Sequence, residues 1–502
     1  KKSRELVFEL LLSDQPKRDI AHDNNSDFWN WIEKVNVKES RFPKKTPCQS
    51  DTSHPSMAVN LDACIQCNLC VRACREVQVN DVIGMAYRGE NSKIIFDFDD
   101  PMGDSSCVAC GECVQACPTG ALMPATVVNE EGVGKSDVDT KVKSVCPYCG
   151  VGCQIEYNVK DNDIKYVNGI DGPANKNRLC VKGRFGFDYV SNPERLTKPL
   201  IRIKGKQKDL HPSIDFSNLH EYFKEVTWDE ALDVVSSKLS NYRGDSFATL
   251  CSAKATNEDG YIQQKFSRLV MQSNHIDHCT RLCHSPSVEA MLTSLGSGAT
   301  SNSYIDYEEA GCLVIIGSDA NSNHPVAASR MRRAVVEKGA KLIVINPRRI
   351  DMCDYADIWL RPRPGTDVAL LNGIANVIIN EGIQDHGFID KRTEGYDDWK
   401  ETVSKYTPDY VESLTGVDAD DIVQAARIYA KPPFSGSCLI WGMGITQHTM
   451  GTANAHGLLN LAFVSGQLGK PGSGVSPLRG QNNVQGCGDA GCLPNAFPGY
   501  QT

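Results

Sequence analysis

The sequence lacks several features that would have assigned it to common classes of protein. No run of about 18 or more apolar residues occurs, so nothing in it predicts a membrane span. No Lys/Arg-rich stripe is present, and the net charge of −9 argues against nucleic acid as the main partner. Neither a G-x-G-x-x-G turn that opens a helix after a strand nor a G-x4-G-K-[ST] loop is found. We therefore expect no nicotinamide or flavin site in this chain.

What the sequence does contain is cysteine, with 21 among 502 residues. In a chain of this length, clustered C-x2-C groups favour metal ligation in a reducing compartment over a disulfide framework. We therefore expect a cytoplasmic protein, of roughly three or four domains by length alone. The chain starts at Lys1 and ends at Thr502 just after a Gly/Pro-rich stretch, and we expect both ends to continue in a longer protein.

The first two runs of cysteines share the spacing C-x2-C-x2-C-x3-C. They are Cys64, Cys67, Cys70 and Cys74, followed by Cys107, Cys110, Cys113 and Cys117. Thiolates at this spacing hold [4Fe–4S] clusters, and in two-cluster ferredoxin folds the fourth cysteine of each run ligates the other cluster. We therefore predict a first cluster completed by Cys117 and a second completed by Cys74, in a domain over residues 56–140. Structural zinc is the alternative, which two tandem copies disfavour.

A third run has the different spacing C-x2-C-x3-C-x26-C. Its members are Cys146, Cys149, Cys153 and Cys180. This spacing could hold zinc, but zinc beside two electron-transfer clusters would serve folding alone, so we predict a third [4Fe–4S] cluster. Lys182 is predicted to lie close to it, with a solvated surface lysine as the alternative. Alternating residues over 154–159 and 164–167 predict short strands in a small domain over 141–205.

From about Thr227 the pattern changes to helices that alternate with buried strands. A helix is predicted over Trp228–Leu239. Strands are predicted over 313–317 and 340–346, on either side of a helix over 327–338. A strand–helix–strand pattern on this scale predicts a parallel α/β sheet with ligand sites at the carboxyl ends of its strands.

The whole chain is therefore expected to be a multidomain α/β protein. It combines a ferredoxin-like two-cluster domain, a small β-rich cluster domain, and parallel, Rossmann-like α/β domains over 206–502. Residues 1–55 open with a helix over 4–12 and receive no role. Residues 129–143, rich in Gly, Asp, Lys and Val, are expected to form a linker.

Two motifs in the α/β region carry candidate chemistry. Cys283 and His284 place a thiol, which is a soft ligand for a heavy redox metal, beside a side chain that titrates near neutral pH. Alone, such a pair is more often structural, and a Cys/His hydrolase would need an orienting third group. Farther along, Arg479 and four amide side chains lie among glycines over 477–486. That composition suits an anionic ligand or a polar heterocycle, with a plain polar loop as the alternative.

Taken together, these motifs resemble the catalytic subunit of molybdenum- or tungsten-dependent formate dehydrogenases of the dimethyl-sulfoxide-reductase family, of the cytoplasmic NAD-linked type. The resemblance covers residues 56–502. It implies that Cys283 ligates the metal, that His284 stands beside it and that Arg479 orients formate. It also implies that Lys182 lies between the third cluster and a pterin.

The same resemblance implies two molybdopterin guanine dinucleotides, molybdenum or tungsten, and three [4Fe–4S] clusters. The residues implied to bind the pterin groups, besides Lys182, are Asn257, Gly317, Asp319, His324, Asn346, Arg348, Gly365, Asp367, Gly442, Gly444, Gln447, His448, Gln481 and Asn482. Asp319 stands where the family usually has Asn, and Asn346 where it usually has Asp. The family's chain continues with a β-barrel domain, which we expect beyond residue 502. Residues 13–31 contain no cysteine, so a further His/Cys cluster is not expected there.

The function that this resemblance implies is the reversible two-electron oxidation of formate to CO2. Electrons would pass through the three clusters to an NAD-reducing partner subunit that carries flavin and iron–sulfur groups. One alternative is another molybdopterin oxidoreductase, such as a nitrate reductase. The other is a non-catalytic electron-conducting subunit like that of NADH:quinone oxidoreductase. The presence of Cys283, His284 and Arg479 favours formate.

Overall fold

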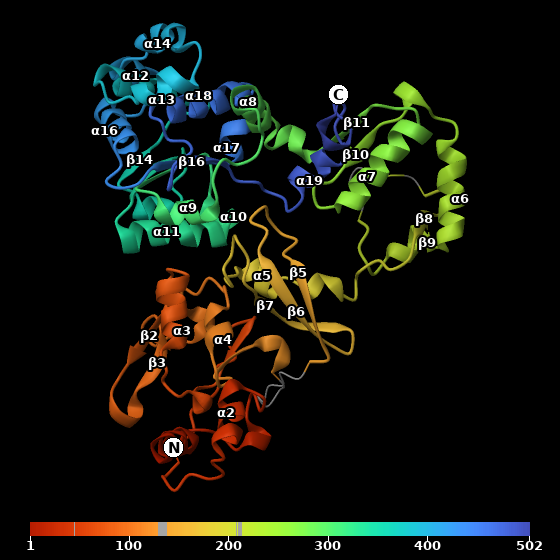
Figure 1. The fold of residues 1–502 in the computed structure, drawn as a ribbon. Coiled ribbons are helices and arrows are strands. Elements are labelled where there is room, and N and C mark those ends of the chain that lie inside the picture. The colour runs from red at the N-terminus through yellow and green to blue at the C-terminus, as the bar shows by residue number, and fades with distance from the viewer. Residues whose placement is uncertain (45, 129–137, 207, 209–212, 502) are drawn as a thin grey trace. The chain divides into compact units, whose positions relative to one another are not determined.

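A computed structural model describes residues 1–502 except 45, 129–137, 207, 209–212 and 502 (Figure 1). The chain divides into two compact units. The first unit consists of Lys1–Phe185 and Thr280–Asn482, and the second of Gly186–Cys279 and Asn483–Thr502. Within the described residues, no helix has the length and apolar character that a membrane crossing requires.

The first unit begins with two helices, α1 (Lys2–Ser13) and α2 (Asp27–Val35). The predicted helix over 4–12 is confirmed as part of α1. Helix α2 buries Phe28, Trp29 and Ile32 in a small core of its own. These aromatic residues therefore serve packing, which agrees with the absence of any assigned chemistry.

The part of the chain that carries the first two cysteine runs is built from very short elements. They are β1 (Met57–Val59), α3 (Leu69–Arg72), β2 (Ile83–Ala86), β3 (Lys93–Phe96), α4 (Glu112–Ala116) and β4 (Leu122–Pro124). Strand β1 pairs antiparallel with β4, and β2 with β3. The apolar core of this part includes the candidate ligands Cys70, Cys74 and Cys113. Its interior is therefore formed in part by thiols rather than by aliphatic side chains alone.

Around the third cysteine run the chain forms an antiparallel meander. Its strands are β5 (Thr140–Val145), β6 (Gln154–Lys160) and β7 (Asp163–Gly169), and helix α5 (Val181–Phe185) follows Cys180. The two predicted strands are confirmed. The linker prediction is wrong for residues 140–143, because they pair in register with β6, from Thr140 opposite Val159 to Val145 opposite Gln154. Residues 138 and 139 lie outside β5, and the remaining residues of that prediction, 129–137, lie outside the described residues.

A five-stranded parallel sheet forms the core of the remaining part of the first unit. Its strands are β12 (Cys312–Ile316), β13 (Lys341–Ile345), β14 (Ile358–Leu360), β15 (Ser437–Trp441) and β16 (Gly474–Pro477), in the order β14-β13-β12-β15-β16. Every residue of β12 and β15 is buried, as expected where helices cover both faces of a sheet. The predicted parallel α/β sheet is confirmed.

Helices lie on both sides of this sheet, with α9 and α11 on one side and α12 and α16 on the other (Figure 1). The helices of this part are α8 (Ser285–Leu295), α9 (Tyr304–Glu309), α10 (Ala320–Asn323), α11 (Pro325–Lys338), α12 (Asp367–Asn380), α13 (His386–Arg392), α14 (Tyr396–Ser404), α15 (Pro408–Thr415), α16 (Ala419–Ala430), α17 (Met443–Thr446) and α18 (Gly451–Val464). The chain order along the sheet reverses between β12 and β15. Such a reversal opens a crevice at the carboxyl ends of the two strands, where α/β proteins bind their ligands.

The second unit is smaller and has shorter strands. It contains β8 (Leu200–Arg202), β9 (Phe223–Glu225), α6 (Trp228–Leu239), β10 (Thr249–Cys251), α7 (Asn257–Lys265), β11 (Ile276–His278) and α19 (Val484–Asp489). Strands β10 and β11 pair in parallel. The bounds of α6 agree with the prediction. Cys251, Cys487 and Cys492 form a buried cluster with Ile276, so these three cysteines pack against one another here.

Candidate active site

The loops that leave β12 and β15 cross each other in close backbone contact at the reversal point of the sheet. Gly317 has a φ of +57°, which favours glycine, and a Cβ there would lie 2.8 Å from the carbonyl carbon of Gly444. A Cβ on Gly444 would lie 2.7 Å from the Cα of Gly317. Glycine at both positions therefore lets the two loops form the floor of the crevice.

The two positions that depart from the family pattern contact the same arginine. The Nη2 atom of Arg348 lies 3.1 Å from a carboxylate oxygen of Asp319. The side-chain oxygen of Asn346 accepts a hydrogen bond of 3.0 Å from the backbone N–H of Arg348. The loops after β12 and β13 are thereby linked, and the carboxylate that pairs with Arg348 comes from the loop after β12.

Three further predicted residues lie in the loops after β14 and β15. Asp367 begins α12 and is largely buried; burial raises the pKa of its carboxyl, and the charge of His448 opposes that rise. His448 Nε2 lies 2.8 Å from the carbonyl oxygen of Gly444. The amide of Gln447 donates a hydrogen bond of 2.7 Å to the carbonyl oxygen of Leu282, the residue before Cys283. The loop after β15 therefore also positions the segment that carries Cys283.

Cys283 and His284 lie just before α8, and both are buried. His284 Nε2 lies 2.8 Å from the carbonyl oxygen of Leu478, and Nδ1 lies 3.2 Å from the hydroxyl of Ser287. Because a carbonyl oxygen can only accept, Nε2 must carry the proton and Nδ1 must accept one from Ser287. The hydroxyl of Ser287 in turn accepts a hydrogen bond of 2.8 Å from the indole N–H of Trp441.

These contacts hold His284 as a neutral imidazole. Burial and the charge of the nearby Arg479 guanidinium together lower the pKa of His284 to about 3. A neutral ring with one donor and one acceptor nitrogen matches the hydrogen bonds to Leu478 and Ser287. In this arrangement His284 connects the Cys283 segment to the segment that carries Arg479.

Arg479 follows β16 and meets the third cysteine run. Its Nη2 atom donates a hydrogen bond of 2.7 Å to the carbonyl oxygen of Gly298. Its own carbonyl oxygen accepts from the backbone N–H of Gly150, at 3.1 Å, and from His324 Nε2, at 2.8 Å. A Cβ on Gly150 would lie 2.5 Å from the Cβ of Arg479. The structure therefore brings Cys283, His284, Arg479 and the loop after Cys149 together.

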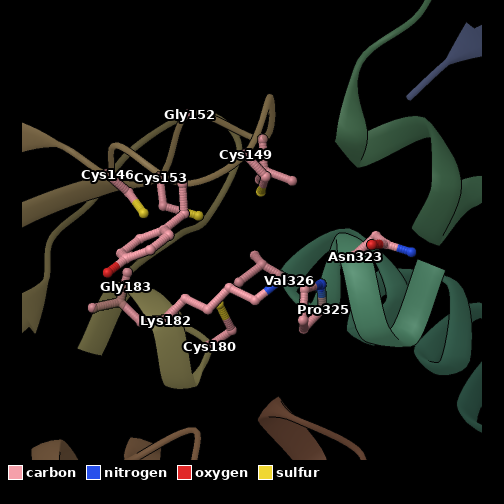
Figure 2. Close-up of a pocket in the computed structure, with 13 residues that line it drawn as sticks. Cys146, Cys149, Gly152, Cys153, Cys180, Lys182, Gly183, Asn323, Pro325 and Val326 are labelled. Atoms are coloured by element: carbon pink, nitrogen blue, oxygen red, sulfur yellow. The ribbon is translucent and has the colours of Figure 1, made fainter. Parts of the chain in front are cut away.

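The cysteines of the third run line one pocket. Cys146, Cys149, Cys153 and Cys180 all line it, together with residues from the start of α11, and Figure 2 shows their sulfur atoms facing the same space. Burial raises the pKa of Cys153, and the other three thiols raise it further. Four thiols around one apolar cavity fit the predicted third cluster, in which iron would offset the repulsion among thiolates.

Lys182 lies along the same cavity and reaches toward α11 (Figure 2). Its side chain is exposed, and its Nζ atom donates a hydrogen bond of 3.3 Å to the carbonyl oxygen of Ser322. The hydroxyl of Ser322 donates to a carboxylate oxygen of Asp319 at 3.0 Å. Lys182 therefore connects the third cysteine run to the crevice loop after β12, as a lysine between a cluster and a pterin would.

The first two cysteine runs meet in the crossed arrangement that their spacing predicts. Burial and the neighbouring thiols of Cys117, Cys64 and Cys67 raise the pKa of Cys70 to about 12. Burial also raises the pKa of Cys113, whose nearest thiols include those of Cys110, Cys107 and Cys74. Cys67 is exposed. Across the described ranges, no three His, Cys, Asp or Glu side chains converge tightly enough to hold a single metal ion.

Comparison with known families identifies the chain. Residues 195–496 match the family described as molybdopterin oxidoreductase, residues 139–192 its Fe4S4 domain, and residues 63–121 a 4Fe-4S dicluster domain. The first of these matches spans more than half of the chain. The chain belongs to the molybdopterin oxidoreductase family. The matched families are described by molybdopterin and by 4Fe-4S clusters, and the match over 139–192 favours a cluster over zinc at the third run.

The relatives of this molybdopterin oxidoreductase are similar over nearly its whole length. It is 36% identical to "Probable oxidoreductase YjgC" of Bacillus subtilis, across 93% of this chain and 50% of that protein. It is 35% identical to "Putative formate dehydrogenase YrhE" of the same organism, across 96% of this chain and 52% of that protein. The chain thus spans about half the length of the curated relatives it matches.

A solved structure also resembles this chain. Acetylene hydratase from Pelobacter acetylenicus matches with a TM-score of 0.55 and 25% sequence identity, across 65% of this chain and 43% of that one. The fold of the present molybdopterin oxidoreductase is thereby shared with a protein whose name denotes a different reaction. Function must accordingly be argued from the residues of the site.

Several buried polar atoms around the crevice fit a polar cofactor. The buried side-chain atoms that have no hydrogen-bond partner within the described residues include the side-chain oxygens of Thr446, Gln481 and Asn482, and Nδ1 of His324. Buried polar atoms are nearly always hydrogen-bonded, so these atoms are suited to bind a ligand. A pterin with its polar ring edge and phosphate arm would supply such partners.

Sequence reasoning named candidate residues for the chemistry but missed the residues that position them. Ser287 contacts His284 and is itself held by Trp441, Gly298 contacts Arg479, and no motif marks these three residues. Gly150 could have been found, because it directly follows Cys149 in the third cysteine run. Asn257 lies in the second unit, where its side-chain oxygen accepts a hydrogen bond of 2.9 Å from Asn483. Its predicted pterin contact stays a prediction.

Proposed function

We propose that this chain is the catalytic part of a formate dehydrogenase of the cytoplasmic, NAD-linked type. The reaction is HCOO⁻ ⇌ CO2 + H⁺ + 2e⁻. One observation carries the proposal: His284 Nε2 binds the carbonyl oxygen of Leu478, so a soft thiol at Cys283 and a guanidinium at Arg479 belong to one site. The relatives support it, because several of them carry the name "Putative formate dehydrogenase".

Arg479 is the residue that recognises formate in this proposal. A guanidinium presents a planar fork of donors that matches a carboxylate, and formate is the smallest carboxylate. The hydrogen bond to Gly298 and the two hydrogen bonds to the Arg479 carbonyl oxygen hold the side chain and its backbone in place. The guanidinium is therefore oriented before substrate arrives, which is what electrostatic recognition requires.

The cofactors in this proposal are two molybdopterin guanine dinucleotides with molybdenum or tungsten, and three [4Fe–4S] clusters. When bound, the metal centre supplies the acceptor of the electron pair, and the clusters carry single electrons away. Cys283 offers the metal a thiolate ligand. The crevice loops after β12, β13 and β15 hold the pterin groups through the residues implied above, with Asp319 and Arg348 as a linked pair.

His284 has a positioning role in this proposal. A histidine beside a metal-ligating thiol is a candidate for holding or relaying the substrate proton. Both of its ring nitrogens are engaged, Nδ1 by Ser287 and Nε2 by Leu478, and its lowered pKa keeps it neutral. It therefore fixes the distance between the Cys283 segment and the Arg479 segment.

The electron route runs from the crevice toward the first predicted cluster. Gly150 and Lys182 link the third cysteine run to the crevice loops. The second predicted cluster follows, and then the first, whose ligand Cys67 is exposed. An electron-accepting subunit with flavin and iron–sulfur groups would dock where Cys67 reaches the surface.

The proposal is tested with the variant Arg479→Ala in the full-length enzyme. Losing two charge-assisted hydrogen bonds, at about 1.5 kcal/mol each, should raise the KM for formate roughly 100-fold. Iron and molybdenum or tungsten content should stay as in the wild type. Arg427→Ala is the matched control, because Arg427 is exposed and pairs with Glu381. Unchanged formate kinetics in Arg479→Ala, or nitrate reduction by the wild type in place of formate oxidation, would refute the proposal.

A further inference from the structure

A buried arginine lies between the second and third cysteine groups. Arg184 belongs to α5, four residues after Cys180, and is only 2% exposed. Its Nε atom donates a hydrogen bond of 3.1 Å to the carbonyl oxygen of Cys110. Its Nη2 atom lies 3.2 Å from a carboxylate oxygen of Glu112, which is also buried. The ion pair therefore joins the helix that follows Cys180 to the start of α4, and the hydrogen bond joins it to the loop that carries Cys110.

The carboxylate of Glu112 is tied to the third cysteine run as well. The amide of Gln78 donates a hydrogen bond of 3.1 Å to Glu112 Oε2 and another of 3.0 Å to the carbonyl oxygen of Leu179, the residue before Cys180. A continuous hydrogen-bonded network thus runs from Leu179 through Gln78 and Glu112 to Arg184 and the Cys110 backbone. It spans the region between the two groups of candidate ligands.

The surrounding backbone is shaped to admit the arginine. Gly111 has a φ of +67°, and a Cβ there would lie 2.9 Å from Cγ of Arg184. Arg184 Nη1 also donates to the carbonyl oxygen of Val167 at 3.3 Å and to the side-chain oxygen of Gln115. Four residues therefore hold the guanidinium: Cys110, Glu112, Gln115 and Val167.

Stability alone does not account for such a pair. Taking two charges out of water costs several kcal/mol per ion, and a well-packed apolar replacement is often as stable. The pair is placed where its field acts on both groups of thiols, since Cys110, Cys113 and Cys180 all lie near the Arg184 charge. Inside a protein, where the dielectric constant is low, such a field is strong.

We propose that the Arg184–Glu112 ion pair sets the relative reduction potentials of the clusters held by Cys74, Cys107, Cys110 and Cys113 and by Cys146, Cys149, Cys153 and Cys180. This inference rests on the cluster assignments of the proposed function. Each transfer oxidises the donor cluster by one electron and reduces the acceptor cluster by one. Two successive transfers carry the electron pair from one formate through the clusters to the electron-accepting subunit of the proposed function, which is reduced by two electrons.

The sign of each contribution follows from charge. A cluster that gains an electron becomes more negative, which the cation of Arg184 favours and the anion of Glu112 opposes. Removing only the positive charge should lower the midpoint potential of the nearby clusters, and removing only the negative charge should raise it. Since Arg184 donates a hydrogen bond to the Cys110 carbonyl oxygen, the midpoint potential of the cluster of the second group should shift more.

The experiment compares Arg184→Gln, Glu112→Gln and the double variant in the full-length holoenzyme. The potentials of the clusters are measured by titration with dithionite and mediators, without formate, and followed by electron paramagnetic resonance. We expect a downward shift for Arg184→Gln, an upward shift for Glu112→Gln, and a double variant close to the wild type. Arg427→Gln, at an exposed ion pair with Glu381, is the control and should not shift any cluster.

The outcomes separate the inference from the proposed function. Shifts of the same sign in both single variants, or no shift in either at full iron content, would overturn the inference. If Arg184→Gln fails to take up iron, two other variants test the inference. Arg184→Lys keeps the charge and should leave the cluster potentials near those of the wild type. Glu112→Gln alone must raise the cluster potentials. Opposite shifts in an enzyme without formate oxidation would support the inference and refute the proposed function.

Discussion

The sheet region and the cysteine-rich region of the first unit are stabilised in different ways. The strands β12 and β15 are buried along their whole length, and a large, mainly aliphatic core packs around them. The strands between residues 56 and 128 have only three or four residues each, and their core includes Cys70, Cys74 and Cys113. The sheet region can therefore hold its loops in place by packing alone, whereas the cysteine-rich region relies on what its thiols bind.

This difference explains where each kind of chemistry is placed. Substrate recognition needs side chains that are oriented in advance, and the contacts of Gly317 with Gly444 and of Gly150 with Arg479 supply such order. Electron relay needs cofactors at fixed positions, and metal binding that is coupled to folding supplies those. The loop after Cys149, in the third cysteine run, contacts the sheet region at Arg479.

The largest effect should come from removing iron. Chelation of iron under reducing conditions should expose the backbone amides of residues 56–128 to hydrogen exchange, because their core contains the ligands. The amides of β12 and β15 should stay protected. Hydrogen exchange followed by mass spectrometry measures both regions at once. Equal loss of protection in the two regions would contradict the comparison.

The next effect should be the loss of turnover in Cys283→Ser. A hydroxyl is a harder and weaker ligand for the metal than a thiolate, so formate oxidation should be abolished. Because Cys283 lies in the packed sheet region, the thermal unfolding midpoint should change little. Cys438→Ser is a matched control, since it is a buried cysteine outside the site. Formate oxidation retained in Cys283→Ser would remove Cys283 from the proposed ligands.

A smaller effect is expected at the junction itself. In Gly150→Ala the new methyl group would meet Arg479 at 2.5 Å, so the Arg479 backbone must move. A displacement of about 1 Å can lower a rate roughly 100-fold, and we expect a fall in kcat/KM for formate of about 10- to 100-fold. Gly84→Ala is the control, because no atom lies within 4 Å of a Cβ there. Equal kinetics in the two variants would show that the junction does not position Arg479.

The smallest effect concerns pH and stability. The pKa of His284 is about 3 in the folded protein and about 6.5 when unfolded, so only the unfolded chain takes up a proton between these values. The free energy of unfolding should therefore fall as pH drops below 6.5, by about 1.4 kcal/mol per pH unit from this residue. Denaturant unfolding at pH 7 and pH 5.5 measures it. A His284→Gln variant should lose this component, and an identical pH dependence in both proteins would contradict the assignment.

The features that depend on local sequence could be predicted, and the contacts between segments distant in the chain could not. Cysteine spacing and the buried strands over 313–317 and 340–346 are local patterns, and the structure brings their residues together as expected. Residues 140–143 have polar side chains typical of a linker. They form a strand because they pair with β6, which the local sequence does not reveal. The contacts of Gly150 with Arg479 and of Arg184 with Glu112 join segments that are distant in the sequence, so a local pattern cannot predict them. The neutral state of His284 likewise depends on burial, which a Cys-His motif does not reveal.

The most direct test of the central claim is elemental analysis of the purified full-length protein, combined with a formate:benzyl-viologen assay on the same sample. The account predicts molybdenum or tungsten, roughly twelve iron atoms for three [4Fe–4S] clusters, and formate-dependent dye reduction. Iron without molybdenum or tungsten, and no reduction by formate, would contradict it and would indicate a subunit that only conducts electrons.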